Sequence, residues 1–170
     1  MKKKDVLVVT YNITLWHHLR DLAVRYQEPG KTINKHITWL HFHQWCKQLI
    51  CVEAGLVDKY NMLWRGRSDI DAILETEMVN LVNEALNLLG ETVSKYDAIL
   101  VDEGQDYNPY WWKTLGRVLK SNGEMLLFAD KTQDMYERAK NWTEDGMKDV
   151  IKGVGFRGPW HILDIGCPLL

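Results

Sequence analysis

The chain has 170 residues, of which 46% are hydrophobic and 26% charged, and its formal net charge at pH 7 is -2. This composition is typical of a globular domain and excludes a largely disordered chain, while the net charge excludes a cationic surface over the whole molecule but not a local basic stripe. No apolar stretch approaches the ~18 residues of a membrane span, and the 3 cysteines are too few and too irregularly spaced for a disulfide framework or a zinc site. We therefore expect one domain in the reducing environment of the cytoplasm.

The first third of the sequence predicts a strand, a helix and a second strand. Residues 5–10 contain a continuous apolar run, which is typical of a strand buried on both faces of a parallel sheet. Asn12 or Thr14 can cap the following helix, whose apolar residues recur with a helical period until a Glu-Pro-Gly sequence at residues 28–30. Residues 37–40 are a second, short strand candidate.

The middle of the chain is predicted to be mainly helical. Residues 42–54 have a helical pattern that Gly55 ends, and a long amphipathic helix is expected over residues 69–89. The intervening residues 57–68 show no clear pattern, so we expect them to be irregular.

The final third contains a strand, a helix and another strand within about 30 residues, which is the size of a right-handed βαβ unit. Residues 98–101 are a buried strand, Asn108 and Pro109 begin the helix, and residues 125–129 are the next strand, after a predicted turn at Asn122-Gly123. Strands that alternate with helices predict an α/β fold with a mainly parallel sheet.

Polar side chains follow both strands of this unit, at the sheet edge where open α/β folds bind ligands. Asp102 and Glu103 come directly after the first strand, and one carboxylate can hold Mg²⁺ while the other faces an attacking water, as phosphoryl transfer requires. Such a pair alone is more often a solvated acidic loop. The presence of Gln105, and of Asp130 and Gln133 after the second strand, favours the functional interpretation.

Four segments resemble motifs of superfamily 1 helicases of the UvrD/Rep kind, and they occur in the order of that family. Residues 99–106 resemble the Walker B motif, residues 126–136 resemble motif III, residues 6–12 are similar to motif Ia, and residues 40–45 are similar to part of motif Ib. The first two motifs are specific, whereas the other two persuade only by their order.

The resemblance implies a three-layer α/β, RecA-like P-loop NTPase fold with a mainly parallel sheet, present only in part. Residues 1–170 would form one partial domain in which residues 41–95 are a mostly helical insertion. The phosphate-binding Walker A loop of the family has no counterpart ahead of the first strand, and Gly30-Lys31-Thr32 follows a helix rather than a strand, so we do not interpret it as that loop. The P-loop segment and a second RecA-like domain would be missing partners.

The resemblance also assigns roles to the polar residues. Asp102 would hold Mg²⁺, with Gln105 and Asp130 beside the nucleotide. Glu103 would polarise the attacking water, and Gln133 would sense the γ-phosphate. ATP and Mg²⁺ are thus the implied cofactors of the complete protein, and the sequence leaves open whether this chain binds either.

For single-stranded DNA, the resemblance points to Tyr11, Asn12, His43 and Tyr136, where the two tyrosines would offer aromatic faces to bases. We expect binding by this chain alone to be weak, because a net charge of -2 supplies little electrostatic attraction.

Two functions remain open from the sequence. The chain is either a fragment of an ATP-dependent DNA helicase or translocase, or a degenerate, non-catalytic domain that binds single-stranded nucleic acid or a protein partner. In either case we expect this chain alone not to hydrolyse ATP at a meaningful rate, since it would lack the phosphate loop and the arginine finger.

Overall fold

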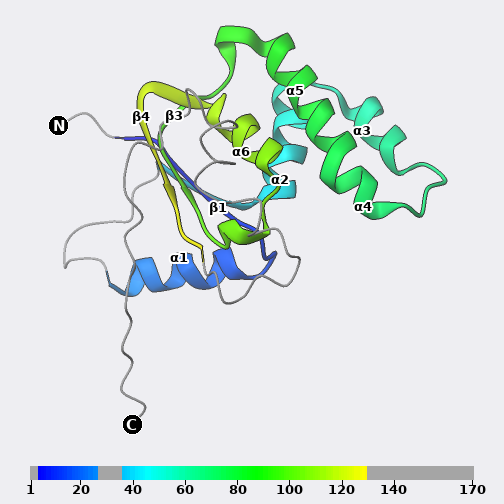
Figure 1. Cartoon of the computed structure of the whole chain (residues 1–170). Coiled ribbons are helices and arrows are strands. Elements are labelled where there is room, and N and C mark those ends of the chain that lie inside the picture. The colour runs from blue at the N-terminus through cyan, green and yellow to red at the C-terminus, as the bar shows by residue number, and fades with distance from the viewer. Residues whose placement is uncertain (1–3, 27–35, 130–170) are drawn as a thin grey trace.

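The computed structural model describes residues 4–26 and 36–129, and the account below is confined to them (Figure 1). These residues contain a 4-stranded parallel sheet with the strand order β2-β1-β3-β4. Its strands are β1 (Val6–Thr10), β2 (Ile37–His41), β3 (Tyr96–Val101) and β4 (Leu119–Leu127). The α/β class and the parallel sheet predicted from the sequence are therefore confirmed.

One face of the sheet is buried under the main helical layer. Leu7 and Val9 of β1, with Ile99 and Val101 of β3, are fully buried in a core shared with three helices. These helices are α2 (Phe42–Lys47), α5 (Met78–Leu89) and α6 (Pro109–Gly116). Apolar burial on this scale, at roughly 25 cal/mol per Å², is the main term that stabilises the domain.

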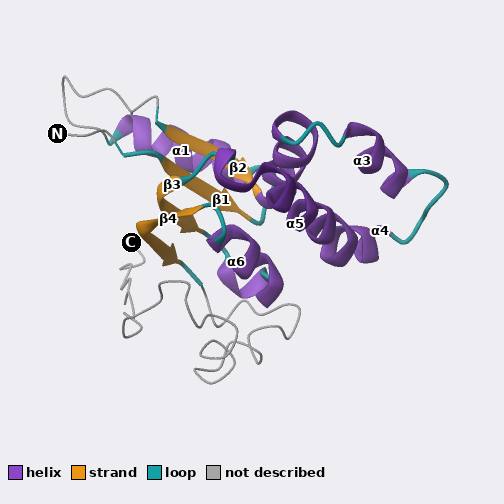
Figure 2. Cartoon of the chain, turned by 90° about the horizontal axis from the view of Figure 1, so that it is seen from above, coloured by secondary structure: helices purple, strands orange, loops and turns teal. Residues whose placement is uncertain are grey.

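The opposite face is covered less completely. The helix α1 (Leu15–Arg25) contacts β1 and β2, on the other side of the sheet from α5 and α6 (Figure 2). It contains no buried residue, and Leu126 on β4 remains 50% exposed. Thr14 is the N-cap of α1, while the side chain of Asn12 accepts hydrogen bonds from the backbone N and Oγ1 of Thr14, both at 2.9 Å.

The expectation that residues 57–68 are irregular is wrong, because α3 (Val57–Trp64) lies within them. Its apolar residues Tyr60, Leu63 and Trp64 pack against the core formed by the preceding and following helices. No side chain caps its first turn. Tertiary packing, rather than a local helix signal, therefore stabilises α3.

The long helix expected over residues 69–89 is present in three consecutive pieces. The short helix α4 (Ile70–Ala72) leads into a π-helical segment (Ile73–Glu77), which continues as α5. Gly90 ends α5 with a φ of 54°, a left-handed conformation that glycine adopts at low cost. A second π-helical segment (Gln48–Glu53) extends α2 in the same way, over the helix expected at residues 42–54.

The predicted turn at Asn122-Gly123 is also wrong, because these residues lie inside the continuous strand β4. The pairing shifts at this point: Tyr96 is opposite Leu119, whereas Ala98 is opposite Glu124. Asn-Gly is a common hairpin turn, but here it accommodates a bulge in a parallel strand.

The amino ends of the strands are linked by a cluster of charged side chains. Lys120 Nζ lies 2.8 Å from Asp97 Oδ2 and 3.4 Å from Asp5 Oδ2, and His36 Nδ1 lies 2.8 Å from Asp5 Oδ1. These contacts lower the pKa of both carboxyls, chiefly through His36 at Asp5 and through Lys120 at Asp97.

No helix in the described part of the chain has the length and apolar character needed to cross a membrane.

Candidate nucleotide site at the carboxyl edge of the sheet

The acidic segment after β3, which we call the Asp102 loop (residues 102–106), is tied to both neighbouring strands. The backbone N of Asp102 donates to the carbonyl of Val9 at 3.0 Å, which links the loop to the end of β1. The backbone N of Gly104 donates to the carbonyl of Phe128 at 2.8 Å, and Phe128 N donates to the carbonyl of Val101 at 2.9 Å. The parallel register and these hydrogen bonds place the loop at the carboxyl edge of the sheet.

Asp102 and Glu103 occupy a strained and partly buried position. Glu103 has a φ of 55°, the left-handed region that non-glycine residues rarely adopt, and no other non-glycine residue of the described chain does so. Such strain clusters at functional sites, where the surrounding structure maintains it. Burial is the largest cause of a raised pKa at Asp102, to which the negative charge of Glu103 adds.

Gln105 holds the carboxylate of Glu103 within the loop. It is 3% exposed, and its side-chain Nε2 donates a hydrogen bond to the Glu103 carboxylate. The buried amide therefore restricts the position of the Glu103 side chain, which is the arrangement a water-orienting carboxylate needs.

The donor set at this edge suits Mg²⁺. A magnesium ion in a nucleotide site is usually bound by one or two carboxylates, with water and phosphate oxygens as its other ligands. A partly desolvated carboxylate with a raised pKa, such as Asp102, gains from a nearby cation. Within residues 4–26 and 36–129, no group of 3 or more His, Cys, Asp or Glu side chains converges on a metal position.

Tyr11 follows β1, and its ring packs against the hydrophobic core. It stacks on Trp111 with ring centroids 6.2 Å apart at 19°, and it meets the edge of Tyr107 at 6.2 Å and 61°. Asn12 beside it is exposed, and its side-chain oxygen holds Thr14. Of these two predicted DNA contacts, Asn12 is the more accessible.

His43 contacts Trp111, as Tyr11 does. Its ring meets Trp111 edge-on at 5.1 Å and 82°, and burial lowers the pKa of His43 to about 4. The side chain is therefore neutral at pH 7 and supplies no charge for a phosphate. Asp130, Gln133 and Tyr136, the remaining predicted site residues, lie outside the described residues.

Trp111 is the centre of this cluster. Its ring stacks on Phe42 at 4.4 Å and 13°, and its Nε1 donates to the carbonyl of Glu75 at 3.1 Å. Trp112 follows Trp111 directly on α6. Both side chains are 1% exposed, so both belong to the core.

Sequence reasoning missed a second concave feature, a groove of about 690 Å³ between α5 and α6. On one side it is lined by Tyr110 and Lys113 of α6 and by Arg117, the residue that caps α6. On the other side it is lined by Asn83 of α5. Their spacing along each helix was visible in the sequence, but the fact that the two helices face each other was not.

A parallel sheet with helices on both faces, and an acidic loop at the carboxyl end of an inner strand, define the chain as a RecA-like α/β domain. The family described as the UvrD/REP helicase N-terminal domain matches residues 10–140, and the chain belongs to this family. No curated protein and no solved structure matched the chain significantly.

Proposed function

We propose that this chain is part of the ATP-dependent motor of a DNA helicase or translocase, as one partial RecA-like domain in which Asp102 and Glu103 act on the nucleotide. The observation that supports this most directly is the Asp102 loop. Its partly buried carboxylate and its left-handed Glu103 are held at the carboxyl edge by hydrogen bonds to two neighbouring strands.

Three residues of the loop have distinct tasks in this proposal. Asp102 would hold Mg²⁺, and Glu103 would accept a hydrogen bond from the water that attacks the γ-phosphate. Gln105 acts through Glu103 and is therefore a positioning residue. The bound Mg²⁺ would neutralise charge that develops on the phosphate oxygens.

Asp130, Gln133 and Tyr136 complete the proposed site as nucleotide, γ-phosphate and DNA contacts. Support for them comes from the family and from the register that pairs Val101 with Leu127, because parallel strands present their carboxyl ends at one edge.

Metal binding tests the role of Asp102 without needing turnover. Titration of the chain with Mn²⁺, followed by electron paramagnetic resonance of the free ion, should reveal a weak site that Asp102→Asn removes. Asp71→Asn, which removes an exposed carboxylate from α4, is the matched control and should bind as the wild type does. Equal Mn²⁺ binding by wild type and Asp102→Asn would contradict the proposed role.

Hydrolysis is expected only from a more complete motor. The printed sequence contains no G-x-x-x-x-G-K-[ST] loop, and loss of an arginine finger alone lowers such rates by ~10³–10⁵. Phosphate release by this chain should therefore stay at background. Turnover of about 1 s⁻¹ that Glu103→Gln abolishes would overturn this expectation.

A degenerate domain that binds single-stranded nucleic acid or a protein without catalysis is the second candidate. Ala129 favours it, because motif III of the family usually has glycine at this position. A chain that binds oligonucleotides but shows no Mn²⁺ site at Asp102 would support this alternative.

A further inference from the structure

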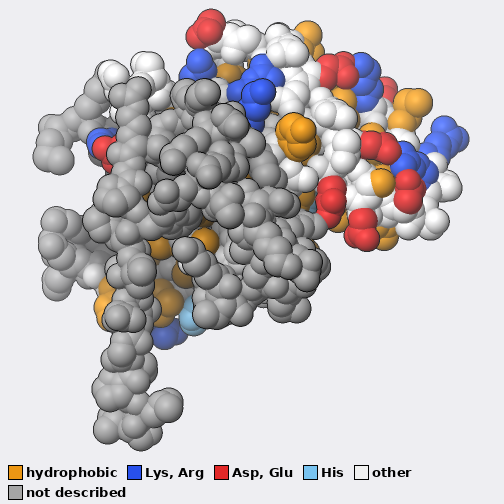
Figure 3. All heavy atoms as spheres, in the orientation of Figure 1, with side chains coloured by type: hydrophobic (Ala, Val, Ile, Leu, Met, Phe, Trp, Pro, Cys, Tyr) orange, Lys and Arg blue, Asp and Glu red, His pale blue; other side chains and the backbone are white. Residues whose placement is uncertain are grey.

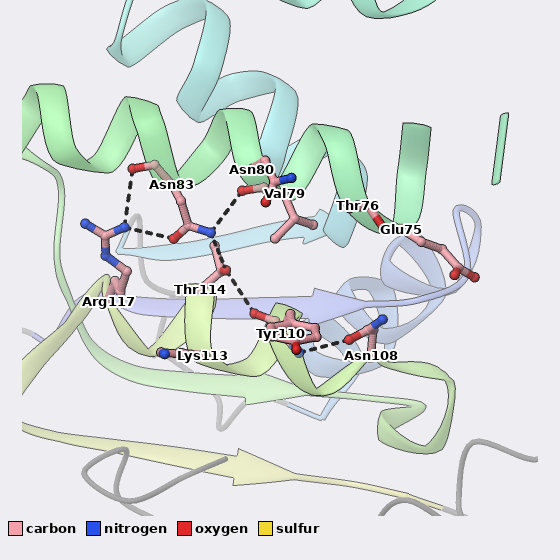
Figure 4. Close-up of a pocket in the computed structure, with 10 residues that line it drawn as sticks. All are labelled: Glu75, Thr76, Val79, Asn80, Asn83, Asn108, Tyr110, Lys113, Thr114 and Arg117. Carbon is pink, nitrogen blue, oxygen red and sulfur yellow. Dashed lines mark hydrogen bonds between the residues drawn. The ribbon is translucent and has the colours of Figure 1, made fainter. Parts of the chain in front are cut away.

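The groove between α5 and α6 lies in the helical layer and is separate from the Asp102 loop. Figure 4 shows α5 along one wall and α6 along the other, with Asn83, Thr114 and Arg117 meeting between them. A smaller cavity of about 380 Å³ continues past the end of α5 and shares Arg117 with the groove. We call the larger feature the α5–α6 groove.

One wall carries an aromatic residue followed by two cations. Tyr110, Lys113 and Arg117 have the i, i+3, i+7 spacing that places side chains on one face of a helix. Tyr110 is 70% exposed, and Lys113 and Arg117 are also exposed. This wall therefore offers a ring face and two positive charges to a ligand.

The other wall carries amides with the same spacing. Asn80 and Asn83 of α5 line the groove, and Asn87, one turn on, lines the smaller cavity. The guanidinium of Arg117 donates to the side-chain oxygens of Asn83 at 2.8 Å and Asn87 at 2.6 Å. Asn83 also donates to Thr114 Oγ1 at 3.2 Å (Figure 4). These bonds span the groove and hold Arg117 in place.

Two of the three charged side chains that line the groove are cations, Lys113 and Arg117, and the third is Glu75. Arg117 bonds only to neutral amide oxygens there, and no described Asp or Glu forms an ion pair with it or with Lys113. Elsewhere the two signs are interspersed, as over α3 to α5 in Figure 3, where Lys59 pairs with Glu84 and Arg67 with Asp69. The lining of the groove therefore carries a net positive charge, on a chain whose net charge is -2.

We propose that the α5–α6 groove binds single-stranded nucleic acid, with phosphates at Lys113 and Arg117 and a base stacked on Tyr110. Amides such as Asn80 add hydrogen bonds that tolerate any base. Stacking combined with backbone charge is how single strands are bound without sequence preference. From Tyr110 to Arg117 the helix rises about 10 Å, which matches about three phosphates at the spacing of a stacked strand.

This site goes beyond the proposed function, because it lies apart from the strand ends, where Tyr11 and Asn12 are expected to contact DNA. It also needs neither ATP nor Mg²⁺. Binding in the groove can therefore fail while the nucleotide proposal stands, and the reverse also holds.

Fluorescence anisotropy of a labelled 12-residue oligothymidylate, with the whole chain and no nucleotide, tests the proposal between about 20 and 200 mM salt. The double variant Lys113→Ala/Arg117→Ala should weaken binding about ten-fold at low salt. It should also reduce the slope of log affinity against log salt by about 1.4, or about 0.7 per phosphate contact. Tyr110→Ala should weaken binding about five-fold or more with the slope unchanged, and Tyr110→Trp should retain binding.

Two controls separate the groove from other surfaces. Arg65→Ala removes an exposed cation beyond the end of α3 that lines neither cavity, and should bind as the wild type does. Arg117→Lys keeps the positive charge but removes the guanidinium, which hydrogen-bonds both Asn83 and Asn87. This variant should retain most of the slope of log affinity against log salt. Circular dichroism of every variant confirms that it is folded.

If Asn12→Ala alone weakened oligonucleotide binding, the result would overturn the proposal for the groove and would support DNA contact at the strand edge instead. Absence of wild-type binding at 20 mM salt, or affinity unchanged in the double variant, would also overturn the proposal. Displacement of the oligonucleotide by polyglutamate of equal length and at equal concentration would show that the groove accepts acidic polypeptide, and would overturn the assignment to nucleic acid.

Discussion

Replacing Gly104 with alanine is expected to destabilise the domain, because atoms of β4 occupy the space that a side chain needs. A Cβ at this position would lie 1.8 Å from Cδ1 of Leu127, 3.0 Å from its Cγ and 3.2 Å from the carbonyl oxygen of Phe128. The hydrogen bond from Gly104 N to that carbonyl keeps loop and strand together. Adding a methyl group to such a packed position costs about 1–3 kcal/mol, toward the lower end because the tip of Leu127 can move.

A double-mutant cycle with Leu127→Ala isolates this contact. Without the Leu127 side chain, Gly104→Ala should be close to neutral, so the two substitutions should show a coupling energy of about 1–3 kcal/mol. Urea unfolding followed by fluorescence of the 8 tryptophans would measure it, as a shift of the midpoint of about 0.5–1.5 M for Gly104→Ala in the wild-type background.

Gly55→Ala is the control for this cycle. Gly55 has a φ of +68° and no atom within 4 Å of an added Cβ, so its substitution should cost about 1–2 kcal/mol through backbone strain alone, equally with and without Leu127. An equal cost of Gly104→Ala in both backgrounds would refute the argument that β4 holds the Asp102 loop in position.

Three further predictions concern stability. Trp111→Ala should lower the free energy of unfolding by about 3–5 kcal/mol in urea, since it empties the centre of the aromatic cluster; a loss below about 1 kcal/mol would contradict that placement. Asp102→Asn should raise the urea midpoint at pH 7, because a raised folded-state pKa means that the charged form is disfavoured in the fold. The gain should shrink as the pH falls and Asp102 becomes protonated; an unchanged midpoint at pH 7 would argue against burial of this carboxylate. Lys120→Ala should lower the midpoint above about pH 4, and its difference from the wild type should narrow at lower pH, since Asp5 and Asp97 have folded-state pKa values below the ordinary 3.8 and their contribution is lost as they protonate. A difference that is constant from pH 2 to 7 would exclude these ion pairs as its cause.

Elements with strong local signals were predicted correctly. The runs around Val8 and Leu100 are apolar without interruption, and such runs are stable only as buried strands of a parallel sheet. Asn108 accepts a hydrogen bond from Tyr110 N at 3.0 Å, as expected for the cap of α6. Gly90 ends α5 because its φ of 54° is costly for other residues.

The errors arose where a local signal was weak or ambiguous. The helix α3 has no side-chain cap at its first turn, and it is stabilised by Tyr60 and Trp64 packing on elements distant in sequence. Asn122-Gly123 suits a hairpin turn, but pairing with β3 continues past it, so the same dipeptide lies in a bulge. In both cases tertiary contacts outweighed the local preference.

The sequence by itself determined the family, the order of the four strands, and the position of Asp102 and Glu103 at the end of a buried strand. Each of these is a property of neighbouring residues, and neighbouring residues set which conformation and which apolar face an element has. Only the tertiary structure showed that the rings of Tyr11 and His43 pack against Trp111. It also showed that β4 leaves no room for a side chain at Gly104, and that the amides of α5 face the cations of α6 across a groove. Those facts depend on which elements meet, and packing between distant segments decides that.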